Sequence, residues 1–237
     1  MRYALFYTPP ADHDLTHIAS RWLGRDAYSG ALLPQPDHTP FSAERLAELT
    51  HAPRRYGFHA TLKAPFELSD DSNENQLVAA MEKFCQSQAA FNMPKFKVGR
   101  LGPFFALVPD SAAHDLNHFA AECVRGFESF RAPMSDADYA RRNPDKLDEQ
   151  QRAYLQQWGY PYIFDAFRFH MTLTGPVPGD EADQMEEVLQ SLFDPHLQAP
   201  LLCDHLTLFC ETEKAGPFTV HTSIPLAPSP ARKAPTL

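Results

Sequence analysis

The sequence predicts an α+β fold of two duplicated lobes, each an antiparallel sheet with helices, arranged with pseudo-twofold symmetry around a central cleft. The first observation is a repeated nine-residue pattern, which reads FHATLKAPF at residues 58–66 and FHMTLTGPV at residues 169–177. The second is a repeated Gly-Pro-Phe, at residues 102–104 and 216–218. The third is that both halves give the same order of expected elements: a strand carrying the repeat, a helix, and two more strands. Such self-similarity indicates a duplicated unit.

The first 50 residues predict one strand and two helices. Aromatic and aliphatic residues fill residues 2–8, which is typical of a short buried strand, and two prolines end it. Asp14 can cap a helix whose apolar residues recur at helical spacing from Leu15 to Trp22, and Gly24 can end that helix. Residues 25–41 contain glycine and several prolines and predict a loop. A short helix is expected over residues 42–50, with a serine able to cap it.

Each repeat alternates polar and apolar residues with the period of two that a strand requires. The alternation predicts that the polar side chains share the open face of each strand while their apolar neighbours pack inward. The polar set consists of His59, Thr61 and Lys63 in the first strand and Arg168, His170, Thr172 and Thr174 in the second. The two strands are expected side by side over the cleft.

The rest of the chain follows the same two periodicities. They predict helices over residues 71–85, 114–130 and 180–193, and strands over residues 201–210 and 217–224. Two further strands, over residues 96–101 and 104–109, are expected to form a hairpin that turns at Gly102-Pro103. The highly charged residues 135–158 predict one or two helices broken near Pro144. We expect residues 1–225 to form a single bilobal domain and residues 226–237, which are rich in proline, to form a flexible tail.

The composition narrows the class of protein. The net charge is −9, which disfavours a long nucleic acid as partner because such binding needs a basic surface. No run reaches the ~18 apolar residues of a membrane span, and the start is too short for a signal-peptide core. The four cysteines lack Cys-x-x-Cys spacing, so they indicate neither a zinc ribbon nor a redox pair. We expect a cytoplasmic protein with no membrane contact, cofactor or metal, and the sequence leaves its oligomeric state open.

Two His-x-Thr strands facing one cleft suit acid–base chemistry on a phosphodiester. An imidazole has an ordinary pKa of ~6.5, so one of His59 and His170 can be neutral while the other is cationic near neutral pH. One can take a proton from the attacking water while the other gives a proton to the leaving oxygen. The hydroxyls of Thr61 and Thr172 can donate to the non-bridging phosphate oxygens. This chemistry requires no metal.

Further polar residues near the repeats are secondary candidates for substrate binding. Lys63 and Arg168 share the strand faces of the two histidines and could add positive charge at the rim of the cleft. Tyr56 and Arg55, just before the first repeat, could also contact the substrate.

Other charged and metal-ligating residues have an ordinary structural interpretation. The pair Arg141 and Arg142 is either a solvated helix face or an anion contact at the cleft edge. The histidines outside the repeats with notable positions are His13, His17, His114, His118, His205 and His221. The first four form two i,i+4 pairs without an evident third metal ligand. His205 and His221, near the ends of the second-half strands, are either structural or part of the cleft lining.

The chain resembles the two-histidine (2H) phosphoesterase superfamily, whose members carry a repeated His-x-Thr/Ser motif in a bilobal fold. Within it, the chain is most similar to an uncharacterised branch that accompanies bacterial phosphonate-utilisation genes. The similarity lies in RYALFY at residues 2–7, WLGRD at 22–26, RYGFHATLKAPF at 55–66, WGYPY at 158–162 and FRFHMTLTG at 167–175. It extends to about residue 225.

The resemblance implies a metal-independent cyclic phosphodiesterase with His59 and His170 as the catalytic pair and Thr61 and Thr172 as phosphate holders. Its expected partner is a small cyclic phosphate, either a nucleotide or a phosphoribosyl cyclic phosphate, since phosphonate breakdown by a carbon–phosphorus lyase yields a ribose cyclic phosphate. Two alternatives stay open. One is an RNA end-processing 2',3'-cyclic phosphodiesterase or 2'-5' ligase-like enzyme, which the acidic charge disfavours. The other is a non-catalytic nucleotide or phosphate sensor, which would need only anion donors.

Overall fold

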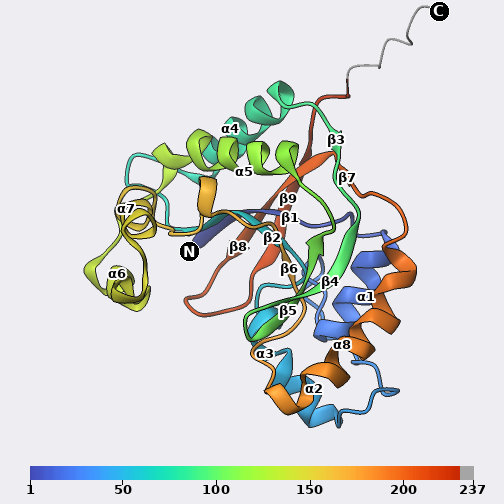
Figure 1. The fold of residues 1–237 in the computed structure, drawn as a ribbon. Helices are drawn as coiled ribbons and strands as arrows, with labels where there is room; N and C mark the ends of the chain where they lie inside the picture. The colour runs from blue at the N-terminus through green and yellow to red at the C-terminus, as the bar shows by residue number, and fades with distance from the viewer. Residues whose placement is uncertain (230–237) are drawn as a thin grey trace, which may run out of the picture.

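The computed structural model describes residues 1–229, and its helices surround antiparallel sheets (Figure 1). The first sheet has the strand order β2-β1-β8-β9, and the second has the order β4-β5-β6. The first consists of β1 (Arg2–Tyr7), β2 (Ala60–Phe66), β8 (His205–Glu211) and β9 (Thr219–Pro225). The second consists of β4 (Phe96–Leu101), β5 (Phe104–Pro109) and β6 (Met171–Thr172), and a small third sheet pairs β3 (Phe91–Asn92) with β7 (Leu202–Cys203). The predicted α+β class is confirmed.

Each large sheet combines strands from both halves of the chain. The first repeat lies at β2, which pairs with β1, and β1 in turn pairs with the β8-β9 hairpin of the second half. The second repeat contains β6, which pairs with the β4-β5 hairpin of the first half. The halves thus exchange their hairpins, and β2 and β6 come into contact. The two repeats therefore meet although more than 100 residues separate them in the sequence.

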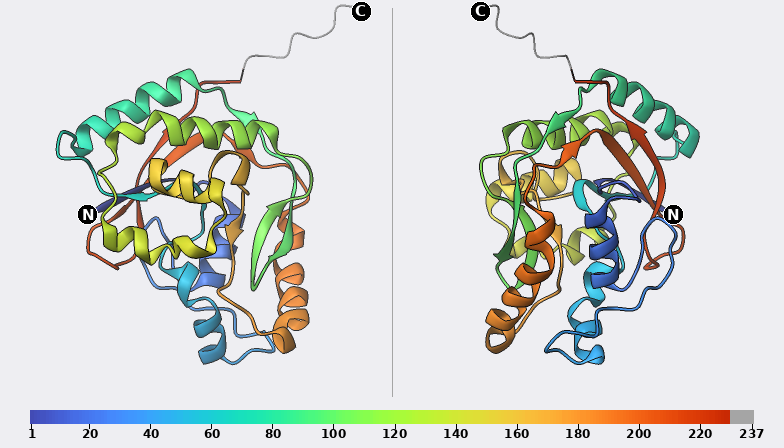
Figure 2. Two further views of the ribbon diagram at one scale, coloured as in Figure 1. Left: turned by 60° about the vertical axis from the view of Figure 1, so that its left-hand side comes forward. Right: turned by 90° about the vertical axis from the view of Figure 1, so that its right-hand side faces the viewer.

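The helices cover the outer faces of the sheets. They are α1 (Asp14–Leu23), α2 (Ala43–Leu49), α3 (His51–Arg54), α4 (Glu74–Ser87), α5 (His114–Gly126), α6 (Asp136–Arg141), α7 (Glu149–Trp158) and α8 (Gly179–Phe193). The pair α4 and α5 lies over the first sheet, while α8 packs against β4 and α1 (Figure 1). The short helices α6 and α7 stand below α5, beside the sheets (Figure 2). In the described residues, no helix has the length and hydropathy of a membrane span.

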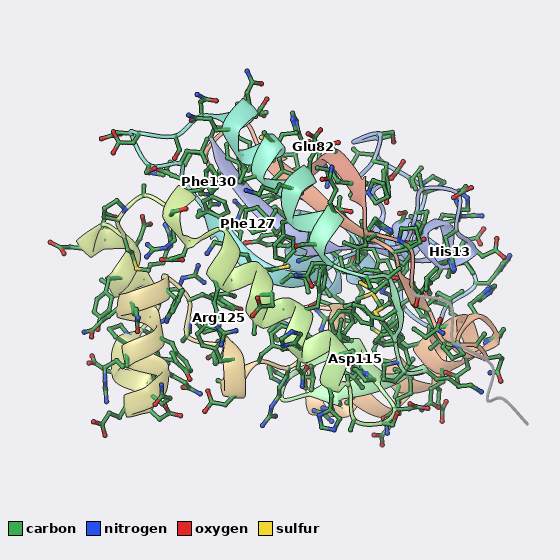
Figure 3. All side chains as sticks on the ribbon, turned by 90° about the horizontal axis from the view of Figure 1, so that it is seen from above. His13, Glu82, Asp115, Arg125, Phe127 and Phe130 are labelled. Atoms are coloured by element: carbon green, nitrogen blue, oxygen red, sulfur yellow. The ribbon has the colours of Figure 1, made fainter. Side chains whose placement is uncertain are left out.

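Strand β1 divides the core into two layers because its side chains alternate between its faces. Tyr3, Leu5 and Tyr7 belong to the large apolar cluster that includes residues of α4, α5 and α8. Ala4 and Phe6 point the other way, into a small cluster with Phe209 and Phe218. Figure 3 looks onto α4 and α5, and Phe127 lies between them with its ring centroid 5.1 Å from that of Phe84. The face of β1 that carries Phe6 is the one next to the candidate site.

Most predicted elements occur within a few residues of their expected bounds. The 96–101 and 104–109 hairpin is confirmed, Gly24 ends α1 in a left-handed conformation, and the charged segment does break near Pro144. The second repeat differs, because only Met171–Thr172 forms a strand. Residues 167–170 alternate in burial as predicted, but their backbone joins no ladder.

The end of the predicted domain also differs. Leu226 donates its backbone N–H to Asp204, and Ala227 donates to the carbonyls of Cys85 and Gln88. These two residues are therefore held against the fold, and a tail boundary at 226 is too early. The predicted tail from residue 230 onward lies outside the described residues.

Candidate active site

His59 is positioned by the turn that leads into β2. Gly57 has φ of +74°, and its carbonyl accepts a hydrogen bond from His59 Nδ1 at 3.0 Å. Because a carbonyl can only accept, Nδ1 carries the proton and Nε2 has a free lone pair in the neutral ring. Nε2 lies 3.3 Å from Thr61 Oγ1. The ring also stacks on Phe6 with a centroid distance of 4.0 Å, so contacts with Gly57, Thr61 and Phe6 together fix its orientation.

His170 is anchored in the same way. Its Nδ1 donates to the carbonyl of Arg168, two residues earlier, at 2.7 Å. The ring lies beside Phe104, at a centroid distance of 5.9 Å. In both repeats, therefore, the carbonyl at position i−2 fixes the tautomer and leaves Nε2 as the atom that can exchange a proton.

The environment of His59 disfavours its charged form. Burial is the largest cause, and the nearby charge of His170 acts in the same direction, while the hydrogen bond to Gly57 opposes them. Together they lower the pKa of His59 to about 4. The unliganded protein therefore carries a neutral His59 at pH 7, which is the form that accepts a proton.

A cavity of about 360 Å³ lies where β1, β2, α3 and the second repeat meet. Its lining combines His59 and Thr61 of the first repeat with Thr172 of the second, and Phe104, beside His170, also lines it. Thr174, further along the second repeat, is buried and its hydroxyl accepts from the backbone of Phe105, which holds this segment in place. Residues of both repeats thus line one cavity, but His170 itself is not among its lining residues in the described part of the chain.

The predicted orientation of Lys63 is wrong. Along β1 and β2, Leu5 is opposite Lys63 while Phe6 is opposite Thr61, so one extra residue, Leu62, interrupts the ladder. Such a bulge reverses the alternation beyond it. Lys63 therefore points away from the cavity, is 3% exposed, and pairs with Glu128 at 2.8 Å beneath α5.

The other secondary candidates differ in whether they line the cavity. Arg168 is exposed and does not line the cavity, and its contribution is the carbonyl that anchors His170. Tyr56 lines the cavity and stacks on Phe218. Arg55 instead bonds to the carbonyl of Gly216 and to Glu211.

Besides Tyr56, three polar lining residues come from outside the repeats. Arg2 lies at the start of β1, Arg142 follows α6, and Tyr160 follows Gly159, the residue that ends α7. The guanidinium of Arg142 lies 5.2 Å from the centre of the Tyr160 ring. The sequence suggested a cleft contact only for Arg142, as one of two interpretations of the Arg141–Arg142 pair. No local pattern pointed to Arg2 or Tyr160.

Three of the remaining histidines, His13, His205 and His221, contact other parts of the fold. His13, and not the predicted Asp14, caps α1 by accepting from the backbone N–H of Leu15. His205 is buried, with its ring nitrogens 2.6 Å from Asp204 and 2.7 Å from the carbonyl of Thr8. His221 lies 3.5 Å from Glu74. Within residues 1–229, no three His, Cys, Asp or Glu side chains are grouped so as to hold a metal.

Comparison with known proteins gives relatives that are longer than this chain. It is 36% identical, over 95% of its length, to Ribose 1,5-bisphosphate phosphokinase PhnN of Janthinobacterium sp. (strain Marseille), and the match covers 51% of that protein. It is 31% identical, over 92% of its length, to the protein of the same name from Laribacter hongkongensis (strain HLHK9), and the match covers 50% of it. The chain thus spans about half the length of these curated relatives.

Among solved structures, similarity is found to TT0787 of Thermus thermophilus, with a TM-score of 0.43 and 14% identity. A structure titled as a phosphoesterase gives a TM-score of 0.40 and 13% identity, and both matches cover 95% of this chain and 98% of the other.

A family model described as Protein of unknown function (DUF1045) matches residues 61–219, which include most of both repeats. The family and the curated relatives agree with the resemblance to the phosphonate-associated branch. The chain belongs to the DUF1045 family.

Proposed function

We propose that this protein is a metal-independent cyclic phosphodiesterase that opens a small cyclic phosphate ester by general acid–base catalysis with His59 and His170. The observation that carries the proposal is the matched anchoring of the two rings. Each Nδ1 donates to the carbonyl two residues earlier, so each Nε2 is left for proton exchange. A purely structural pair of histidines would not need the same tautomer set in the same way at both repeats.

In the first half of the reaction, His59 acts as the general base. Its pKa, lowered to about 4, keeps it neutral, and a bound phosphodiester anion would raise that pKa toward the range where a base is effective. Nε2 takes a proton from water as the water oxygen bonds to phosphorus. The hydroxyl of Thr61, 3.3 Å from Nε2, is close enough to the reacting group to turn to a non-bridging oxygen.

In the second half, His170 acts as the general acid. It enters as the imidazolium and gives its Nε2 proton to the ester oxygen as the bond from that oxygen to phosphorus breaks. Thr172, which lines the cavity two residues further on, donates to a phosphate oxygen. One water is consumed and one P–O bond is broken, and the product is a phosphomonoester with a free hydroxyl. The proton moves from His59 back to His170 through solvent.

The curated relatives suggest which ester is cleaved. Their printed name is a ribose 1,5-bisphosphate phosphokinase, and this chain matches about half of each. Opening the 1,2-cyclic phosphate of ribose 5-phosphate at the bond to O2 yields ribose 1,5-bisphosphate, which is the substrate in that name. We therefore favour this phosphoribosyl cyclic phosphate as substrate and cleavage at O2.

The test is a panel of cyclic phosphates followed by phosphorus NMR. The panel contains ribose 5-phosphate 1,2-cyclic phosphate, ribose 1,2-cyclic phosphate and nucleoside 2',3'-cyclic phosphates, with and without a chelator. The proposal expects turnover of a ribose 1,2-cyclic ester that a chelator leaves intact, and loss of turnover in His59→Asn and His170→Asn variants that remain folded. Turnover of the nucleoside esters alone would favour the RNA end-processing alternative. Tight binding without any product would favour the sensor.

A further inference from the structure

The cavity is positively charged although the whole chain is acidic. Its lining includes the guanidinium groups of Arg2 and Arg142, and no Asp or Glu is part of the lining within the described residues. The net charge of the chain is −9. A local surplus of cations in such a chain indicates a site that receives an anion.

The charge of Arg2 is only partly neutralised. Glu211, which is 1% exposed, bonds to both Arg2 and Arg55, so a single carboxylate serves two guanidinium groups. Burial works against the ionised form of Glu211, yet the two arginines hold its pKa below its usual value. The carboxylate is therefore ionised, and the three groups together carry one positive charge.

Arg142 adds a second positive charge. Among the ion pairs of residues 1–229, none involves Arg142, whereas its neighbour Arg141 pairs with Asp138 at 2.7 Å. The ring of Tyr160 lies next to the guanidinium and limits where it can move. In addition, Tyr56 and Tyr160 line the cavity, and among the described residues neither phenol hydroxyl has a hydrogen-bond partner. Hydrogen-bond donors without partners thus gather around the surplus charge.

We propose that Arg142, together with Arg2 and the hydroxyls of Tyr56 and Tyr160, forms a second anion subsite that selects substrates carrying a phosphomonoester in addition to the cyclic phosphate. The proposal rests on the proposed function, because it assumes that the cyclic ester binds at the two histidines. A phosphomonoester carries nearly two negative charges, which match the two surplus positive charges, and its oxygens accept from the free donors. A nucleobase fits less well because the ring of Tyr56 already stacks on Phe218 and that of Tyr160 faces Arg142.

The kinetic test compares kcat/KM for ribose 5-phosphate 1,2-cyclic phosphate with kcat/KM for ribose 1,2-cyclic phosphate. The two esters differ only in the second phosphate. The wild type should prefer the phosphorylated ester, and Arg142→Gln should lower that preference by about 10- to 100-fold, the range for hydrogen bonds to a charged group. Arg141→Gln is the matched control, because it removes the same charge one residue away and should keep the wild-type preference.

A binding test separates this proposal from the proposed function. Calorimetry measures the affinity of the wild type for ribose 1,5-bisphosphate and for ribose 1-phosphate, whether or not either cyclic ester is turned over. Tighter binding of the bisphosphate, weakened by Arg142→Gln and not by Arg141→Gln, supports the subsite even if no hydrolysis occurs. Equal affinity for the two ligands, or equal effects of the two substitutions, would overturn it. Thermal unfolding of both variants checks that each is folded, and Arg142→Lys should restore part of the preference.

Discussion

The neutral state of His59 makes the stability of the protein depend on pH. An unfolded histidine has an ordinary pKa of ~6.5, whereas burial lowers the pKa of His59 to about 4 in the folded protein. Between these two values, the unfolded chain binds more protons than the folded one. The free energy of unfolding must therefore fall as the pH drops through this window, and the effect of His59 ends below pH 4.

The size of the effect follows from the shift. A shift from the ordinary pKa of ~6.5 to about 4 corresponds to at most ~3 kcal/mol at ~1.36 kcal/mol per unit, and most of it, ~2 kcal/mol, is lost by pH 5. Partial exposure of the ring makes this an upper value.

The assay is denaturant unfolding of the wild type and His59→Gln at a series of pH values from 8 to 4. Other titrating groups act on both proteins, so the difference between the two curves isolates His59. The wild type should lose more stability than the variant on going to pH 5. His51→Gln, at an exposed position in α3, is the control and should follow the wild-type curve.

A direct measurement comes from NMR titration of the His59 ring. Parallel stability curves for wild type and His59→Gln, together with a His59 midpoint near or above the ordinary value, would refute the claim that burial keeps this ring neutral. The role of His59 as the base would then have no electrostatic support.

Three further predictions concern the groups around the histidines. Thr61→Val and Thr172→Val should each lower kcat by about 10- to 100-fold with little change in KM, since each removes one hydrogen-bond donor to the transition state. Steady-state kinetics measures both constants. A change in KM alone would mean that the threonine only binds the substrate. Lys63→Met should leave kcat/KM unchanged. It should lower the free energy of unfolding by about 2 kcal/mol, because it removes a charged hydrogen bond to Glu128, which keeps its ion pair with Arg131. Denaturant unfolding that shows no loss would contradict the contribution of this pair. Gly57→Ala should destabilise the protein by about 2 kcal/mol or more, since φ is +74° and the new Cβ would come within 2.4 Å of Ala27. An Ala variant that is as stable and active as the wild type would show that this turn does not hold His59.

The fold class and the pair of repeats could be predicted because both depend on local patterns. Alternating and helical periodicities gave nearly all of the strands and helices, and the duplication of His-x-Thr led to the expectation that the halves meet. The exchange of hairpins between the two halves could not be predicted, since pairing of strands far apart in the chain leaves no mark on the periodicity of either strand.

The residues that surround the two His-x-Thr motifs in the site were less predictable than the motifs themselves. Counting positions along residues 58–66 places Lys63 beside His59, but one extra residue at Leu62 reverses the alternation. Only the pairing with β1 reveals that bulge. Arg2 and Tyr160 reach the cavity through the tertiary fold, from distant parts of the sequence, so no local spacing could associate them with the repeats.

The most direct measurement is phosphorus NMR of ribose 5-phosphate 1,2-cyclic phosphate incubated in ¹⁸O-labelled water with wild type, His59→Asn or His170→Asn protein. With the wild type, paired-histidine hydrolysis predicts ribose 1,5-bisphosphate that carries one ¹⁸O in the phosphate group esterified at C1. Both variants should be folded and leave the ester intact. Undiminished opening of the ring by either variant, or a wild type that opens none of the cyclic esters, would contradict catalysis by the two repeats.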